Sequence, residues 1–293
     1  MLRILLSPAL DRAGRPSAPK IAVLLALLAP AAWLAARAAL HDLGPRPFDE
    51  VIHQTGLWAV RLLFVSLAVT PLRQLLRWPK LIQVRRMIGV AAALYASAHL
   101  FLYAADQAFD IGRVASEIVL RVYLTIGFTA LVGLLLLAAT STDGMLRRLG
   151  GKNWRLLHRL VYLIGALAVV HFFMQSKLNV TEPTWMAGLF LWLMGYRLLD
   201  ARFGAKGRLP LWAVASLAPV AAALTIGGEA LYFWLHRGID PMRVLAANLS
   251  LAGGLRPGLI VLAVGAALAL AALLRRDRGT TGRRREALAT AAG

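Results

Sequence analysis

The chain contains no cysteine and few acidic residues. Its 293 residues include 14 Asp and Glu against 33 Lys and Arg. The absence of cysteine excludes disulfides, thiolate-held iron–sulfur clusters and the C-x-x-C-H attachment of c-type haem. No Gly-rich nucleotide-binding loop, soluble domain or internal repeat is visible either. A chemistry built on thiolates is therefore not expected.

Apolar residues dominate what is present. The chain is 59% hydrophobic, its mean hydropathy is +0.66, and several apolar runs are long enough to cross a bilayer. A net charge of +19 would indicate nucleic acid in a soluble protein. Here the cations cluster in short segments between apolar runs, as the positive-inside rule expects. We predict an all-α polytopic transmembrane bundle in a lipid bilayer, with no nucleic-acid partner.

Eight spans are expected, at about 21–40, 55–72, 87–105, 117–139, 153–177, 185–199, 211–235 and 257–274. The expected parts are a cytoplasmic segment 1–20, a core 21–208, two additional helices 209–274 and a disordered tail 275–293. The first apolar run could instead be a signal peptide, because Ala36-Arg37-Ala38 resembles a cleavage site. Its length favours a retained membrane anchor. The distribution of Lys and Arg places both termini in the cytoplasm.

Three histidines lie inside apolar runs, where a polar ring needs a partner. His99 follows Arg86 by thirteen residues, and His171 follows His158 by thirteen. Because both spans enter from the cytoplasmic side, the rings of His99 and His171 are expected at one height in the outer half. This pattern is typical of two axial ligands clamping one b-type haem. The alternative is that the two rings only form hydrogen bonds between helices.

The third histidine, His158, lies near the cytoplasmic entrance with Arg85 and Arg86. Arginine does not ligate iron, but it pairs with a propionate or a phosphate. On a straight helix His158 would point about 140° away from His171, so a shared haem-facing side would need a kink. We interpret these three residues as an inner-leaflet site for a second haem, a flavin or a quinone. The alternative is that they serve only topology and headgroup contact.

Other polar residues carry weaker hypotheses. Arg61 and Arg121 would either neutralise haem propionates or extend toward the membrane surface. Glu229, inside an apolar run, is a candidate for a proton path. The outer loops, residues 41–54 and 106–117, hold more carboxylates than cations, which would steer a partner with a basic face.

The chain resembles the MsrQ family, formerly YedZ, through four strings: GPRPFDEVIHQTGLWAVRLLFVSLAVTPLR, VRRMIGVAAALYASAHLFLYA, RVYLTIG and TSTDGMLRRLGGKNWRLLHRLVYLIGALAVVHFF. The likeness covers about residues 20–205, and its RRM-I/L-G, T-S-T and L-H-x-x-V-Y-L motifs are specific. This family is the haem-binding membrane subunit of bacterial periplasmic protein-methionine-sulfoxide reductase systems, and it belongs with the ferric-reductase-like transmembrane domains.

The resemblance implies a six-helix core that passes electrons across the inner membrane. The donor would be a cytoplasmic flavin reductase or quinol, and the acceptor a periplasmic molybdopterin subunit, which itself reduces methionine sulfoxide. Family ligand positions fall on His99 and His171, with His158 as an additional histidine and Arg85 and Arg86 at a basic pair. The implied cofactors are haem b, one or two per chain, and FMN. The spans beyond residue 209 depart from the usual shorter member.

Two other functions remain open at this point. A stand-alone ferric-reductase-like electron carrier would use the same haem scaffold, but it normally carries its own NADPH and flavin domain, which this sequence lacks. A transporter would use buried charges as a substrate path and would bind no haem.

Overall fold

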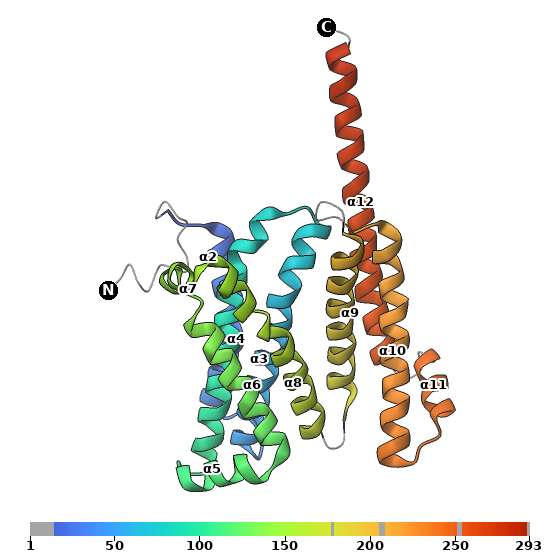
Figure 1. Cartoon of the computed structure of the whole chain (residues 1–293). Coiled ribbons are helices and arrows are strands. Elements are labelled where there is room, and N and C mark those ends of the chain that lie inside the picture. The colour runs from blue at the N-terminus through green and yellow to red at the C-terminus, as the bar shows by residue number, and fades with distance from the viewer. Residues whose placement is uncertain (1–14, 177–178, 205–208, 251–253, 292–293) are drawn as a thin grey trace. The chain divides into compact units, whose positions relative to one another are not determined.

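The computed structural model describes residues 15–176, 179–204, 209–250 and 254–291, with side chains as far as residue 275. This part of the chain is helical, joined by short turns (Figure 1). Its elements are α2 (Ala18–Ala39), α3 (Pro47–Leu75), η2 (Pro79–Leu81), α4 (Ile82–Asp106), α5 (Ile111–Leu120), α6 (Val122–Ala139), α7 (Asp143–Leu157), α8 (Leu160–Gln175), α9 (Thr181–Phe203), α10 (Leu211–Arg237), α11 (Pro241–Leu249) and α12 (Pro257–Ala291). The predicted all-α polytopic bundle is confirmed.

Six described helices are long and apolar enough to cross a membrane, and a seventh span is added if α7 and α8 count as one bent pair. A bilayer admits such helices because they satisfy all backbone hydrogen bonds internally. Eight spans were expected from the sequence. The expected sixth span, 185–199, lies within α9, whose 23 residues are long enough to cross a bilayer. Charged residues near the ends of α9 make it less apolar than the other six helices.

Two expected spans also differ in form. The fourth was expected from residue 117, but α6 begins at Val122 because Arg121 has an extended backbone and separates it from α5. The fifth was expected as one straight helix over 153–177. Instead α7 ends at Leu157, α8 begins at Leu160, and the two axes are bent by 47°.

The chain forms two compact units. The first comprises Met1–Leu67 and Ile82–Gln175, and the second Ala68–Leu81 and Ser176–Gly293. Helix α9 therefore groups with α10 and α12, although the sequence suggested that the core would run to residue 208. Helix α12 continues to Ala291, through most of the tail that was expected to be disordered. The final turns are rich in Ala, Arg, Leu and Glu, which favour helix.

Helix α2 is bonded into the first unit at two places. Near Pro30, the Tyr95 hydroxyl from α4 donates to the carbonyl of Leu27 (2.9 Å) and accepts from the amide of Ala31 (3.0 Å). Proline lacks an amide hydrogen and weakens the helix ladder there, so a side chain can insert. This hydroxyl lies one helical turn before His99, which ties α2 to the helix that carries the candidate site.

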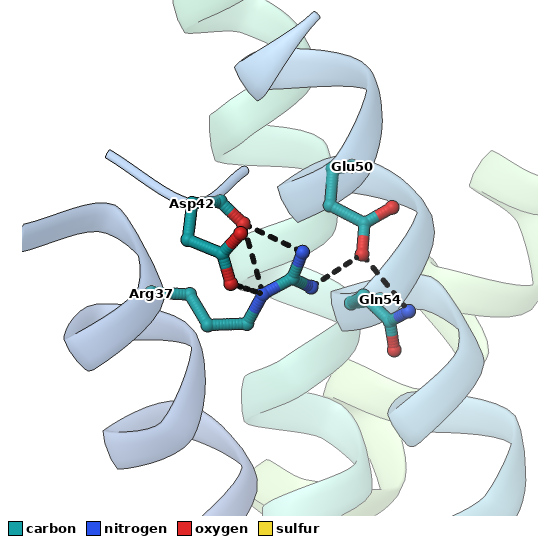
Figure 2. Close-up of polar contacts among 4 residues, drawn as sticks. All are labelled: Arg37, Asp42, Glu50 and Gln54. Atoms are coloured by element: carbon teal, nitrogen blue, oxygen red, sulfur yellow. Dashed lines mark hydrogen bonds and ion pairs between the residues drawn. The ribbon is translucent and has the colours of Figure 1, made fainter. Parts of the chain in front are cut away.

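The second attachment of α2 lies at its C-terminal end (Figure 2). The Arg37 guanidinium donates to Glu50 of α3 (2.8 Å) and to the backbone carbonyl of Asp42 (2.6 Å). Glu50 also accepts from the amide of Gln54 (3.3 Å). Helix α2 is thus held to α3 at one end and to α4 near its middle.

The second unit contains a buried polar pair. Glu229 on α10 is 6% exposed and Asn248 on α11 is 1% exposed. The Asn248 amide donates to Glu229 (2.8 Å) and to the Val244 carbonyl (3.1 Å). The carboxylate considered for a proton path therefore holds the short helix α11 against α10.

Candidate functional site

The structure places His99 of α4 beside His171 of α8. Their ring centroids are 6.4 Å apart and the ring planes are nearly perpendicular, at 82°. His99 precedes the end of α4, Asp106, by seven residues, and His171 precedes the end of α8, Gln175, by four. The pair therefore lies about 6 to 10 Å from these helix ends, on the side expected to face outward.

Each ring is oriented by a backbone carbonyl from a neighbouring helix. His99 Nδ1 bonds the carbonyl of Ile52 on α3 (2.7 Å), and His171 Nδ1 bonds that of Tyr123 on α6 (2.8 Å). A carbonyl only accepts, so Nδ1 carries the hydrogen and Nε2 of each ring carries the free lone pair. The described residues give neither Nε2 a hydrogen-bond partner.

A glycine makes room for each ring. A Cβ on Gly56 would lie 2.8 Å from Nδ1 of His99, and a Cβ on Gly127 would lie 2.6 Å from Cε1 of His171. Each glycine follows the residue with the accepting carbonyl by four positions. The carbonyl and the space left by the glycine therefore lie on the same face of the helix. Sequence reasoning missed both glycines, because other apolar spans of this chain also contain glycine without lining a site.

The pair suits one metal atom held between the two rings. Metal–imidazole bonds are about 2 Å long, so two rings on opposite sides of one metal have centroids about 6 Å apart. No group of three or more His, Cys, Asp or Glu in the described residues is placed to hold a bare ion. A metal between these rings would therefore bring its remaining ligands with it, as the iron of haem does.

On the side expected to face outward, Arg121 occupies the corner between α5 and α6. It forms an ion pair with Glu117 of α5, and its Nη1 donates to the Tyr123 hydroxyl (3.1 Å). The Tyr123 hydroxyl, and after it Glu117, raise the pKa of Arg121 above its already high ordinary value. The residue whose carbonyl orients His171 is thus itself held by a charged side chain. Neither role suggested for Arg121 from the sequence included this pairing.

At the opposite end, His158 lies at the bend between α7 and α8. Its Nδ1 bonds the Trp154 carbonyl (3.1 Å) and its Nε2 lies 3.3 Å from the Ser141 hydroxyl. The ring also stacks on Trp154, with centroids 3.8 Å apart. The expected 140° separation from His171 holds only for a straight helix, and α7 and α8 are bent by 47° here. Because both ring nitrogens have partners, the geometry favours a structural role for His158 over ligation of iron.

The structure brings Arg85 and Arg86 near His158, as the sequence suggested. Both guanidinium groups lie within electrostatic range of its ring. Arg86 pairs with Asp143 at the start of α7 (2.6 Å), and the Arg85 carbonyl accepts from Ser66 (3.4 Å). The three predicted inner residues therefore form one cluster, although Arg86 already has a carboxylate partner.

The T-S-T motif turns the chain from α6 into α7 beside this cluster. The Thr140 carbonyl accepts from the Trp154 indole (2.8 Å), and the Thr142 hydroxyl caps α7 by accepting from the Met145 amide (3.2 Å). The middle residue, Ser141, contacts His158 as described. The motif thus positions the stacked pair of Trp154 and His158.

Comparison with known proteins places this arrangement in a family. The family described as "Ferric reductase like transmembrane component" matches residues 55–169, which include His99 and stop two residues before His171. A Rhodospirillum rubrum protein named protein-methionine-sulfoxide reductase heme-binding subunit MsrQ is 43% identical over 202 residues, 68% of this chain and 95% of the relative. The chain belongs to the MsrQ family. The resemblance inferred from the sequence motifs is therefore confirmed.

Other MsrQ proteins give similar values. The Xanthomonas campestris pv. campestris (strain 8004) protein is 46% identical over 188 residues, 62% of this chain and 86% of the relative. The Caulobacter vibrioides protein is 39% identical over 189 residues, 64% of this chain and 90% of the relative. No solved structure matches the chain. These MsrQ proteins are covered almost completely, whereas about a third of this chain lies outside each alignment.

Proposed function

We propose that the chain is a haem-binding electron-transfer subunit in the membrane, with His99 and His171 as axial ligands of one b-type haem. The observation that carries the proposal is the pair of adjacent imidazoles, each fixed by a carbonyl through Nδ1 and each with Nε2 available. The printed name of the MsrQ relatives, heme-binding subunit, supports it.

The bound haem would accept and release one electron at its iron. Imidazoles at both axial positions leave no open coordination site, which favours electron transfer over oxygen chemistry. The carbonyls of Ile52 and Tyr123 fix the tautomer and orientation of the two rings and raise their basicity as ligands. Gly56 and Gly127 let the backbones of α3 and α6 approach the rings closely enough for these hydrogen bonds.

The position of the pair suggests the direction of electron flow. It lies nearer the ends of α4 and α8 that the positive-inside rule places outside, with both termini in the cytoplasm of a bacterial inner membrane. We therefore propose a periplasmic molybdopterin-containing methionine-sulfoxide reductase subunit as acceptor. A cytoplasmic flavin reductase or quinol is the proposed donor. This chain carries electrons and does not itself reduce methionine sulfoxide.

The cluster of Arg85, Arg86 and His158 is proposed as the entry side for those electrons. Two arginines beside a polar corner suit the phosphate of FMN, the propionates of a second haem or a quinone headgroup. In this proposal His158 positions Trp154 and the corner after α6, and it does not bind a metal.

The test is an absorption spectrum of the purified protein, oxidised and reduced with dithionite. We expect a six-coordinate b-type spectrum that is lost in His99→Ala and in His171→Ala, while His158→Gln keeps it. A folded wild-type protein without haem absorbance, after expression with ample haem, would support a transporter instead. Full haem content in either alanine variant would remove the assigned ligand pair.

A further inference from the structure

Helix α7 carries a cluster of cations on a bent, amphipathic segment. Its exposed basic side chains are Arg147, Arg148, Lys152 and Arg155, called here the basic elbow. They flank Gly150, whose φ of 73° and ψ of 150° break the helix. That backbone region is open essentially only to glycine, so this residue fixes where the segment turns.

The cations of the basic elbow differ from three arginines on the side expected to face outward. Arg37, Arg46 and Arg121 each pair with a carboxylate. Within the described part of the chain, none of the four elbow cations has an ion-pair or hydrogen-bond partner. The single acidic residue of α7, Asp143, is already bound by Arg86. The elbow therefore presents positive charge that the protein does not neutralise.

The chain also fixes the level at which the elbow lies. The candidate span α6 ends at Ala139 and the apolar helix α8 begins at Leu160, bent by 47° from α7, so α7 connects the two at the end of α6. Half-buried apolar residues, including Leu146, Leu149 and Leu157, line the other side of α7. A helix with these two faces lies in the headgroup region of a bilayer.

We propose that the basic elbow binds the phosphate groups of anionic phospholipids in the leaflet at which α6 ends. Unpaired Lys and Arg at headgroup level are the chemistry that recognises such lipids. The positive-inside rule accounts for basic residues at this face, but it requires neither the glycine-fixed bend nor the absence of carboxylate partners. Leu156 lies among these cations and its side chain is 63% exposed. An exposed leucine is better suited to contact with lipid acyl chains than to a protein-docking surface in water.

The experiment measures phosphatidylglycerol and phosphatidylcholine binding to the delipidated full chain by native mass spectrometry. The variant Arg147→Gln/Arg148→Gln/Lys152→Gln is compared with Arg77→Gln/Lys80→Gln/Arg202→Gln, which removes three cations elsewhere. Each basic residue near an anionic surface contributes about fivefold in affinity, so the elbow variant should lose about a hundredfold for phosphatidylglycerol. The control variant should lose less than a few-fold, and phosphatidylcholine binding should stay unchanged.

A second variant, Gly150→Ala, keeps every charge but cannot adopt the bend, and it should also weaken phosphatidylglycerol binding. The haem spectrum serves as the check of folding in all variants. Equal loss in the two triple variants would overturn the proposal, as would binding of inorganic phosphate as tight as that of the lipid. Unchanged lipid binding with slower reduction by a protein donor would assign the elbow to that donor instead.

Discussion

Replacing Gly127 with alanine should remove the haem while leaving the fold in place. The new Cβ would lie 2.6 Å from Cε1 and 2.7 Å from Nδ1 of His171. Carbon atoms pack best at about 3.5 to 4.0 Å, so the ring has to retreat by about 1 Å. That shift breaks its 2.8 Å hydrogen bond to the Tyr123 carbonyl and moves Nε2 by half the length of a metal–nitrogen bond.

The matched control is Gly133→Ala on the same helix. There the Cβ would meet Ile164 at 2.8 Å, an aliphatic side chain that can rotate away and that binds nothing. Overpacking typically costs about 1 to 3 kcal/mol, so both variants should melt at lower temperature than the wild type. Only Gly127→Ala should lose haem, whereas Gly133→Ala should retain the wild-type content.

The assay is haem per protein from a pyridine haemochrome spectrum, alongside thermal unfolding of each variant. Gly56→Ala should behave like Gly127→Ala, because its Cβ would crowd His99 at 2.8 Å. A Gly127→Ala protein with full haem content and an unshifted six-coordinate spectrum would refute the reasoning. Equal haem loss in Gly133→Ala would show that general overpacking, and not the ligand, is responsible.

Three further outcomes are expected. Arg121→Gln should lower the midpoint potential of the haem, because loss of a nearby positive charge favours the oxidised state. Glu117→Gln should raise that potential. A redox titration in which the two variants shift the midpoint potential in the same direction would contradict this. Arg85→Gln/Arg86→Gln should weaken flavin, quinone or second-haem binding and leave the outer haem spectrum intact, as measured by cofactor titration. Asp106→Asn should slow reoxidation by the outer partner at low salt only, in stopped-flow mixing; a slowing that persists at high salt would argue against electrostatic steering.

The steering expectation is weaker than the sequence suggested. Asp42 and Glu50 both bind Arg37, and Asp49 binds Arg46, so much of the acidic excess of the outer loops is neutralised. Asp106 remains beside a shallow hollow of about 360 Å³ that Asp49 also lines. Composition counts charges along the chain, whereas the field that a partner meets depends on which charges pair in space.

Much of the fold followed from the sequence because long apolar runs have few alternatives in a bilayer. The closeness of His99 and His171 also followed, since a fixed rise per residue converts position along a helix into depth. The bend at His158 could not be predicted. The apolar pattern continues across it, and the contacts of the His158 ring at the bend, with the Trp154 carbonyl on α7 and the Ser141 hydroxyl in the turn before α7, are visible only in three dimensions.

The supporting residues were also beyond sequence reasoning. Ile52 and Tyr123 act through their backbone carbonyls, so their side chains give no signal. Gly56 and Gly127 contribute by having no Cβ. The importance of that absence can be recognised only once the position of the neighbouring histidine ring is known. The length of α9 was underestimated, because only its apolar stretch 185–199 was expected to be helical, whereas the helix extends into charged residues at both ends.

The arrangement of a histidine ring, a backbone carbonyl that orients it and a glycine that makes room for it occurs twice. His99 follows Gly56 by 43 positions, and His171 follows Gly127 by 44. Helices α3 and α4 therefore contain a complete half-site before Tyr123 has been synthesised. During translation the first imidazole can be oriented by its own helix pair, and the second waits for α8 to insert. Capture of the proposed haem would then be a late event in biogenesis, joining two halves that are each already formed.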